Sequence, residues 1–163
     1  MKPLLAAILL TALLPIASPV LSADGAQTAY YPQRTDDAAR LDAALASAKA
    51  EGKLAVIVFG ADWCHDSQAL AALLTSDAFR GEFGARFTVT FIDVGVPQDG
   101  RGRNLDLAGR FGVAKMSGTP TMVVVSPRGK RLNGRKDAYS WRNAASRDRA
   151  EVLGWFRKIA AKE

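Results

Sequence analysis

A short apolar run that leads into a turn and then into a helical pattern constrains this chain more than any other feature. Residues 54–59 (Leu-Ala-Val-Ile-Val-Phe) are rich in β-branched residues and are short enough for a buried strand. A Gly-Ala-Asp turn follows, and residues 68–74 have the pattern of a helix. Cys64 therefore falls at a strand-to-helix junction, where unpaired backbone N–H groups and the helix dipole favour a thiolate over a thiol. Because the thiolate is the form that attacks disulfides, this position suits a reactive cysteine.

The number of cysteines limits how the fold is stabilised. The chain has 163 residues, 48% of them hydrophobic, which is the length and composition of a single globular domain. Cys64 is the only cysteine, so no internal disulfide can form and the fold must rest on its hydrophobic core. Cys64 is then either an inert buried thiol or a reactive one, and the Trp-Cys turn favours an exposed, reactive thiol.

The first 23 residues have the pattern of an export signal peptide. One basic residue, Lys2, precedes an apolar core at residues 4–16, and small residues follow at positions 22 and 23. A membrane anchor is the alternative, but two prolines and a serine interrupt the roughly 20 apolar residues that a spanning helix needs. We therefore expect cleavage between about residues 22 and 26 and a periplasmic or secreted protein.

The net charge gives little support to a nucleic-acid partner. It is +6 for the whole chain and falls to +5 when Lys2 is removed with the signal. Such an excess indicates a solvated basic face, since no aromatic residues are interleaved with the basic ones and no nucleic-acid-binding module is recognisable. We expect no nucleic-acid partner, and no membrane partner after removal of the signal.

Hydrophobic periodicity predicts alternating helices and strands after an extended lead-in at residues 24–35. Helices are expected at residues 36–51, 64–74, 77–83, 103–111 and 143–161. Strands are expected at residues 54–59, 87–94 and 121–125, and a hairpin turn at residues 126–129 leads to a fourth strand near residues 130–132. Residues 95–103 are expected to form a loop. Because a helix joins the first two strands, they should form a right-handed βαβ unit with parallel pairing.

Three separated stretches resemble the thioredoxin superfamily. Residues 59–64 (Phe-Gly-Ala-Asp-Trp-Cys) resemble its active-site strand and turn, residues 106–113 (Asp-Leu-Ala-Gly-Arg-Phe-Gly-Val) its third helix and following turn, and residues 118–121 (Gly-Thr-Pro-Thr) its cis-proline loop. The resemblance implies an α/β, thioredoxin-like three-layer fold over residues 36–163. It also implies a mixed four- to five-stranded sheet flanked by helices.

The chain departs from the family at two positions that serve the same chemical step. Dithiol members carry Cys-x-x-Cys, whereas Ser67 stands at the second position here, and Val58 replaces the acidic residue that many members bury in the central strand. In thiol–disulfide exchange, the first thiolate forms a mixed disulfide that a second thiol then breaks. A serine hydroxyl neither ionises near neutral pH nor displaces sulfur. The sequence therefore predicts a monothiol protein that starts this reaction and cannot finish it alone.

The resemblance implies a catalytic set of Cys64, His65 and Ser67. As an imidazolium, His65 would favour the neighbouring thiolate; the alternative is a solvated helix residue without a role. Ser67 either hydrogen-bonds the Cys64 thiolate or packs where a cysteine would otherwise lie. Asp66 is an acid in the first turn of a helix, where the dipole favours it, and its charge would oppose a thiolate, so we assign it no catalytic role.

The resemblance also implies a substrate-binding set of Trp63, Thr119 and Pro120. Trp63 is expected to form a wall of the site. A cis peptide before Pro120 would expose the backbone of Thr119, on which an extended substrate segment lies in the family; an ordinary trans loop proline is the alternative. Arg101 and Arg103 either form a rim for acidic substrates or belong to a flexible connector, and the connector is the better interpretation.

Two functions fit these residues. One is an exported thioredoxin-like monothiol–disulfide oxidoreductase that forms mixed disulfides with protein thiols or disulfides, or with small thiols, through Cys64. It would act as an isomerase, a deglutathionylase or a thiol holder. The other is a redox-inactive module that binds extended protein segments over Thr119 and Pro120. Neither needs a cofactor or a metal, and we expect a monomer.

Overall fold

The computed structural model describes residues 28–163 of the chain. The predicted signal peptide, residues 1–23, lies outside the described residues, as does the start of the predicted lead-in. Residues 28–36 form no helix or strand and lead into the first helix. Among residues 28–163, no helix is long and apolar enough to cross a membrane.

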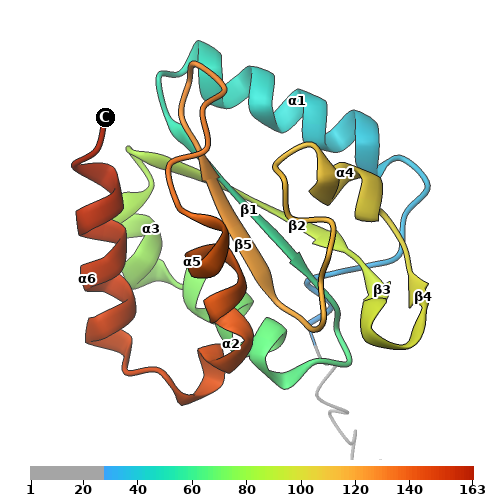
Figure 1. Ribbon diagram of the computed structural model, residues 1–163. Coiled ribbons are helices and arrows are strands. Elements are labelled where there is room, and N and C mark those ends of the chain that lie inside the picture. The colour runs from blue at the N-terminus through green and yellow to red at the C-terminus, as the bar shows by residue number, and fades with distance from the viewer. Residues whose placement is uncertain (1–27) are drawn as a thin grey trace, which may run out of the picture.

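A three-stranded mixed sheet forms the centre of the domain (Figure 1). The central strand β1 (Leu54–Gly60) pairs in parallel with β2 (Phe87–Asp93) and antiparallel with β5 (Thr121–Val125). All residues of β1 are buried, which is the pattern of a strand covered on both faces. The predicted parallel pairing of the first two strands is confirmed.

Helices cover both faces of this sheet (Figure 1). The odd-numbered residues of β1 pack in a core with α1 (Asp37–Ala50) and α4 (Leu105–Gly109). The even-numbered residues pack with α2 (His65–Leu74), α3 (Asp77–Phe83) and α6 (Arg149–Ala160). Side chains of successive strand residues point to opposite faces, so one strand supplies both cores. This is the predicted three-layer α/β arrangement.

Buried aromatic rings hold α6 against α3 and β2. The ring of Phe156 contacts those of Phe79 and Phe87 edge-on, with centroids 4.9 and 5.4 Å apart. Phe156 has no exposed surface, so its truncation to alanine is expected to cost roughly 3–5 kcal/mol.

The expected loop at residues 95–103 instead contains a small two-stranded ribbon. It consists of β3 (Gly95–Val96), the 3₁₀ helix η1 (Pro97–Asp99) and β4 (Arg101–Gly102). Gly100 makes the tight return between the strands possible, because its φ of 83° is unfavourable for residues with a side chain. The ribbon places Arg103 back beside the end of β2, where its N–H donates to the carbonyl of Val94.

The expected fourth strand near residues 130–132 does not form, so the sheet has fewer strands than predicted. The turn after β5 exists, but only an isolated bridge between Val125 and Arg131 follows it. The side chain of Asn133 takes the place of a longer strand: it accepts from the N–H of Val124 and donates to the carbonyl of Met122, both at 2.9 Å. Together with the N–H of Leu132, which donates to the carbonyl of Val124 at 2.8 Å, these bonds satisfy the edge of β5 without a fourth strand.

The predicted final helix at residues 143–161 is interrupted. The chain first forms α5 (Arg135–Tyr139) and the 3₁₀ helix η2 (Ser140–Ser146), and α6 begins only at Arg149. Asp148 defines that start, because its carboxylate accepts from the N–H groups of Ala150 and Glu151. The helices and strands predicted between residues 36 and 94 are confirmed, with bounds that differ by one residue at most.

Candidate active site

The only thiol of the chain lies between β1 and α2, at the N-cap of α2. No side chain of residues 28–163 caps this helix, so its first N–H groups remain available to stabilise negative charge on Cys64. The Cys64 Sγ donates to the carbonyl oxygen of Thr119, 3.4 Å away. Only 9% of Cys64 is exposed, so the expectation of an exposed thiol is wrong.

The loop opposite the thiol has the cis peptide bond that the resemblance implied, between Thr119 and Pro120. Both residues are buried and lead directly into β5, which fixes the loop to the sheet. The Thr119 carbonyl is used by Cys64, whereas its N–H has no hydrogen-bond partner among residues 28–163. A backbone donor therefore remains available beside the thiol.

Ser67 lies in the first turn of α2 and is completely buried. Its hydroxyl has no hydrogen-bond partner among the described residues, so the proposed bond to Cys64 is not formed. The hydroxyl instead packs against the backbone of Gly60, where an added Cβ would lie 2.9 Å from it. Of the two predicted alternatives, the structure has the packing one.

His65 is exposed and makes no hydrogen bond or ion pair with Cys64 in the described part of the chain. It lines a hollow of about 350 Å³ together with Thr28, Tyr30 and Gln68. The imidazole thus lies on the solvent side of α2, next to the thiol in sequence but not hydrogen-bonded to it within the described residues.

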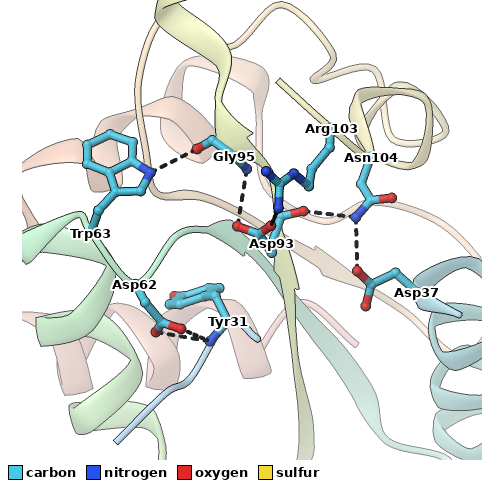
Figure 2. Close-up of polar contacts among 8 residues, drawn as sticks. All are labelled: Tyr31, Asp37, Asp62, Trp63, Asp93, Gly95, Arg103 and Asn104. Carbon is cyan, nitrogen blue, oxygen red and sulfur yellow. Dashed lines mark hydrogen bonds and ion pairs between the residues drawn. The ribbon is translucent and has the colours of Figure 1, made fainter. Parts of the chain in front are cut away.

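Tyr31, from the lead-in, belongs to the site although sequence reasoning did not place it there. Its hydroxyl donates to the carbonyl of Ser67 at 3.1 Å, and only 3% of the residue is exposed. The N–H of Tyr31 donates to the carboxylate of Asp62 at 3.1 Å (Figure 2), and the N–H of Tyr30 donates to the same carboxylate at 2.9 Å. Burial, followed by the nearby charges of Cys64 and Asp62, raises the pKa of Tyr31 well above its usual value. No spacing rule in the sequence says where a tyrosine of an extended lead-in docks.

Trp63 forms the exposed wall of the site, with 54% of its surface accessible. Its indole N–H donates to the carbonyl of Gly95, 3.0 Å away (Figure 2). The N–H of Gly95 donates to Asp93 at 3.1 Å, and Arg103 pairs with the same carboxylate at 2.8 Å. Asn104 continues the network by donating to the carbonyl of Asp93. The ribbon of β3 and β4 therefore orients Trp63.

The charged residues near the site that were considered from sequence are engaged in internal contacts. Arg101 pairs with Asp99, and Arg103 pairs with Asp93, so neither is an unpaired rim cation. Asp66 accepts from the N–H of Ala145 at 2.9 Å, which joins α2 to η2. This contact gives Asp66 a structural role. Among residues 28–163, no group of histidine, cysteine or acidic side chains could hold a metal ion.

Comparison with known proteins agrees with this geometry. Residues 37–127 match the thioredoxin-like family. The chain belongs to this family. A solved structure titled as a disulphide isomerase from Xylella fastidiosa Temecula1 is 31% identical in sequence to the thioredoxin-like chain, with a TM-score of 0.72. The similarity covers 82% of this chain and 98% of that one. No curated protein matches.

Proposed function

We propose that this thioredoxin-like protein is a monothiol–disulfide oxidoreductase that forms mixed disulfides through Cys64. The family and the disulphide isomerase among similar structures support a thiol–disulfide oxidoreductase-type function. The observation that carries the finer proposal is the Cys64 thiol at an uncapped helix start, 3.4 Å from the Thr119 carbonyl beside a cis peptide. A helix start favours the thiolate, and the thiolate is the attacking form.

In the proposed reaction, the Cys64 thiolate attacks one sulfur of a substrate disulfide. A new S–S bond forms between Cys64 and that sulfur, the substrate S–S bond breaks, and the second substrate sulfur leaves as a thiolate. An outside thiol, or another cysteine of the same substrate, then attacks the substrate sulfur and returns Cys64 as a thiolate. Ser67 cannot perform this second step, because its hydroxyl is buried and does not displace sulfur.

We assign Trp63, Thr119 and Pro120 to binding the substrate segment. The available Thr119 N–H can donate to a backbone carbonyl of an extended segment, as in β-strand addition. Trp63 offers an apolar surface next to the thiol. Protein disulfides are therefore the proposed substrates, together with mixed disulfides of small thiols.

The second candidate is a redox-inactive module that binds extended segments at the same loop. The observation in its favour is the 9% exposure of Cys64, which limits access to the thiol. Alkylation of Cys64 measured against pH separates the two candidates. Rapid reaction well below pH 8.5, the reference value for a free thiol, supports the oxidoreductase, and slow reaction without activation supports the module.

Intact mass spectrometry tests the oxidoreductase directly. Incubation with glutathione disulfide is expected to give a one-to-one glutathione adduct of the wild-type protein and none of Cys64→Ser. The same adduct on Cys64→Ser, or no adduct on a wild-type protein that is folded by circular dichroism, would contradict the proposal.

We further propose that the protein is exported and acts in the periplasm or outside the cell as a monomer. The charge and apolar pattern of residues 1–23 supports export. Sequencing the N-terminus of the protein from its native host is expected to find cleavage between about residues 22 and 26. A mature protein that begins at Met1 would refute this.

A further inference from the structure

Three carboxylates on the segments that carry and flank Cys64 are held by internal contacts. Asp62 accepts from two backbone N–H groups, Asp66 accepts from the N–H of Ala145, and Asp93 accepts from Arg103 and the N–H of Gly95. Each of these three carboxylates thus already has a hydrogen-bond or ion-pair partner within the protein.

Three cations near the cis-peptide loop are not paired with a carboxylate among residues 28–163. Lys115, Arg135 and Arg142 are exposed, and none of them pairs with a carboxylate in the described part of the chain. We call these three residues the basic patch. Unpaired, exposed cations are available to a charged partner at little desolvation cost.

The basic patch includes a hollow in the surface. Lys115 and Arg135 line a depression of about 520 Å³, with Gly109, Gly112, Ala114 and Tyr139 forming the rest of its lining. None of these lining residues is acidic. The backbone carbonyl of Tyr139 accepts from Nε of Arg142 at 3.1 Å, so this residue connects the hollow to the third cation.

The loop that begins in the hollow ends at the thiol. Arg142 donates from Nη1 to the hydroxyl of Ser117 at 2.6 Å, and its side chain lies against Gly118, directly before Thr119. Lys115 precedes Thr119 by four residues, a span of about 14 Å at most for an extended chain. A substrate segment on the Thr119 backbone can therefore reach the basic patch within about five residues of its reacting cysteine.

We propose that the basic patch recognises acidic residues in the substrate segment that carries the reacting disulfide. This inference rests on the proposed function, because it needs a substrate sulfur at Cys64. The occupant is an extended, acidic polypeptide segment, chosen by charge complementarity with three unpaired cations. Arg142 is the specificity-determining residue nearest to the thiol, since it contacts the two residues that precede Thr119.

Peptides with an activated cysteine test the proposal. Three peptides of equal length carry a central cysteine as a mixed disulfide with thionitrobenzoate, flanked on both sides by glutamates, glutamines or lysines. The Cys64 thiolate forms an S–S bond to the peptide sulfur and displaces thionitrobenzoate, whose release gives the rate, and the adduct mass confirms the product. At low salt the wild-type protein is expected to react about fivefold faster with the glutamate peptide than with the glutamine peptide. This rate advantage should shrink in 0.5 M salt, because the Debye length there is only about 4 Å and the charges are screened.

Variants separate the charge of the basic patch from the structure of the loop. Arg142→Gln is expected to lower the glutamate-to-glutamine rate ratio about twofold, and the triple glutamine variant of the basic patch should bring the ratio close to one. Lys158→Gln removes an exposed cation on α6 and should leave the ratio unchanged. Ser117→Ala removes the hydrogen bond to Arg142 but keeps the cation, so the ratio should remain above one.

Two results would overturn the proposal. One is an equal rate of the wild-type protein with the glutamate and glutamine peptides; the other is a ratio that the triple variant does not change. If no peptide reacts at all, the proposed function fails instead, and fluorescence anisotropy then tests the basic patch alone. Labelled peptides with serine in place of cysteine should bind only in the glutamate form, and equal or absent binding of both forms would overturn the basic patch as well.

Discussion

The hydroxyl of Tyr31 donates a hydrogen bond to the carbonyl oxygen of Ser67, 3.1 Å away, and so joins the lead-in to the first turn of α2. The same tyrosine packs against Gly60, where an added Cβ would lie 2.6 Å from its ring. The backbone N–H of Tyr31 donates to the carboxylate of Asp62, which holds the lead-in a second time (Figure 2). Three parts of the chain that surround Cys64 are therefore fixed by one buried side chain.

Replacing Tyr31 with phenylalanine tests this contact through the pH dependence of stability. At pH 8 the variant is expected to be about 1 kcal/mol less stable to urea, because it lacks the hydroxyl but keeps the ring. The pKa of Tyr31 is raised in the folded state by burial, so the folded protein keeps this proton while the unfolded chain loses it above about pH 10. The stability contributed by the hydroxyl is full below pH 10 and is lost above it. The difference between the two proteins should thus shrink as pH rises beyond 10.

Tyr30→Phe is the matched control, since it changes the adjacent tyrosine, which is less buried. Its stability relative to wild type should show no such trend. A difference between wild type and Tyr31→Phe that stays constant from pH 8 to pH 11 would contradict the assigned role of the buried hydroxyl.

Asp93 is expected to support both stability and the orientation of Trp63. Asp93→Asn removes the ion pair with Arg103 while that guanidinium stays partly buried, which should cost about 1–3 kcal/mol in urea unfolding. The emission of Trp63 should shift, because the ribbon that accepts its indole N–H is loosened. Asp99→Asn breaks the exposed pair with Arg101 and should leave both measurements unchanged. Equal effects of the two variants would show that the network does not orient Trp63.

His65 is expected to make only a small contribution to the reactivity of Cys64. Its side chain is exposed and lines a hollow on the solvent side of α2, so water screens its charge. His65→Ala should slow alkylation of Cys64 at pH 7 by less than about tenfold. A much larger loss would mean that the imidazole acts on the sulfur directly.

The fold near the thiol could be predicted because its local patterns agree with its tertiary contacts. The apolar run at residues 54–59 is buried on both faces of the sheet, and the helix predicted after Cys64 begins at His65. The motifs at residues 59–64, 106–113 and 118–121 carried the resemblance to a family that the comparisons confirm. In such regions short-range pattern and long-range packing give the same answer.

Features that depend on single side chains could not be predicted in this way. Asn133 replaces the fourth strand through two side-chain bonds, and Asp148 sets the start of α6 by capping. The docking of Tyr31 joins residues 36 positions apart in the sequence. Cys64 is buried and donates to the carbonyl of Thr119, which lies 55 positions further along the chain. None of these contacts leaves a periodic pattern in the sequence.

Restoring a second thiol at position 67 is expected to change how an adduct is released. Cys64 and Ser67 lie three residues apart at the start of α2, so a thiol at position 67 would lie close to the adduct sulfur. Ser67→Cys should therefore release a Cys64 adduct by forming an internal disulfide. Mass spectrometry detects the product as a protein two hydrogens lighter than the reduced variant. Release should be slow, because the fully buried Val58 provides no group to accept the proton of the new thiol.

The most direct test of a monothiol mechanism is the rate of adduct loss against the concentration of added thiol. The mixed disulfide of Cys64 with glutathione is prepared, reduced glutathione is added at increasing concentration, and intact mass follows the loss of the adduct. For the wild-type protein the rate should be proportional to glutathione and extrapolate to zero without it, whereas Ser67→Cys should keep a finite rate at zero glutathione. A wild-type protein that loses its adduct at a finite rate without added thiol would contradict the account.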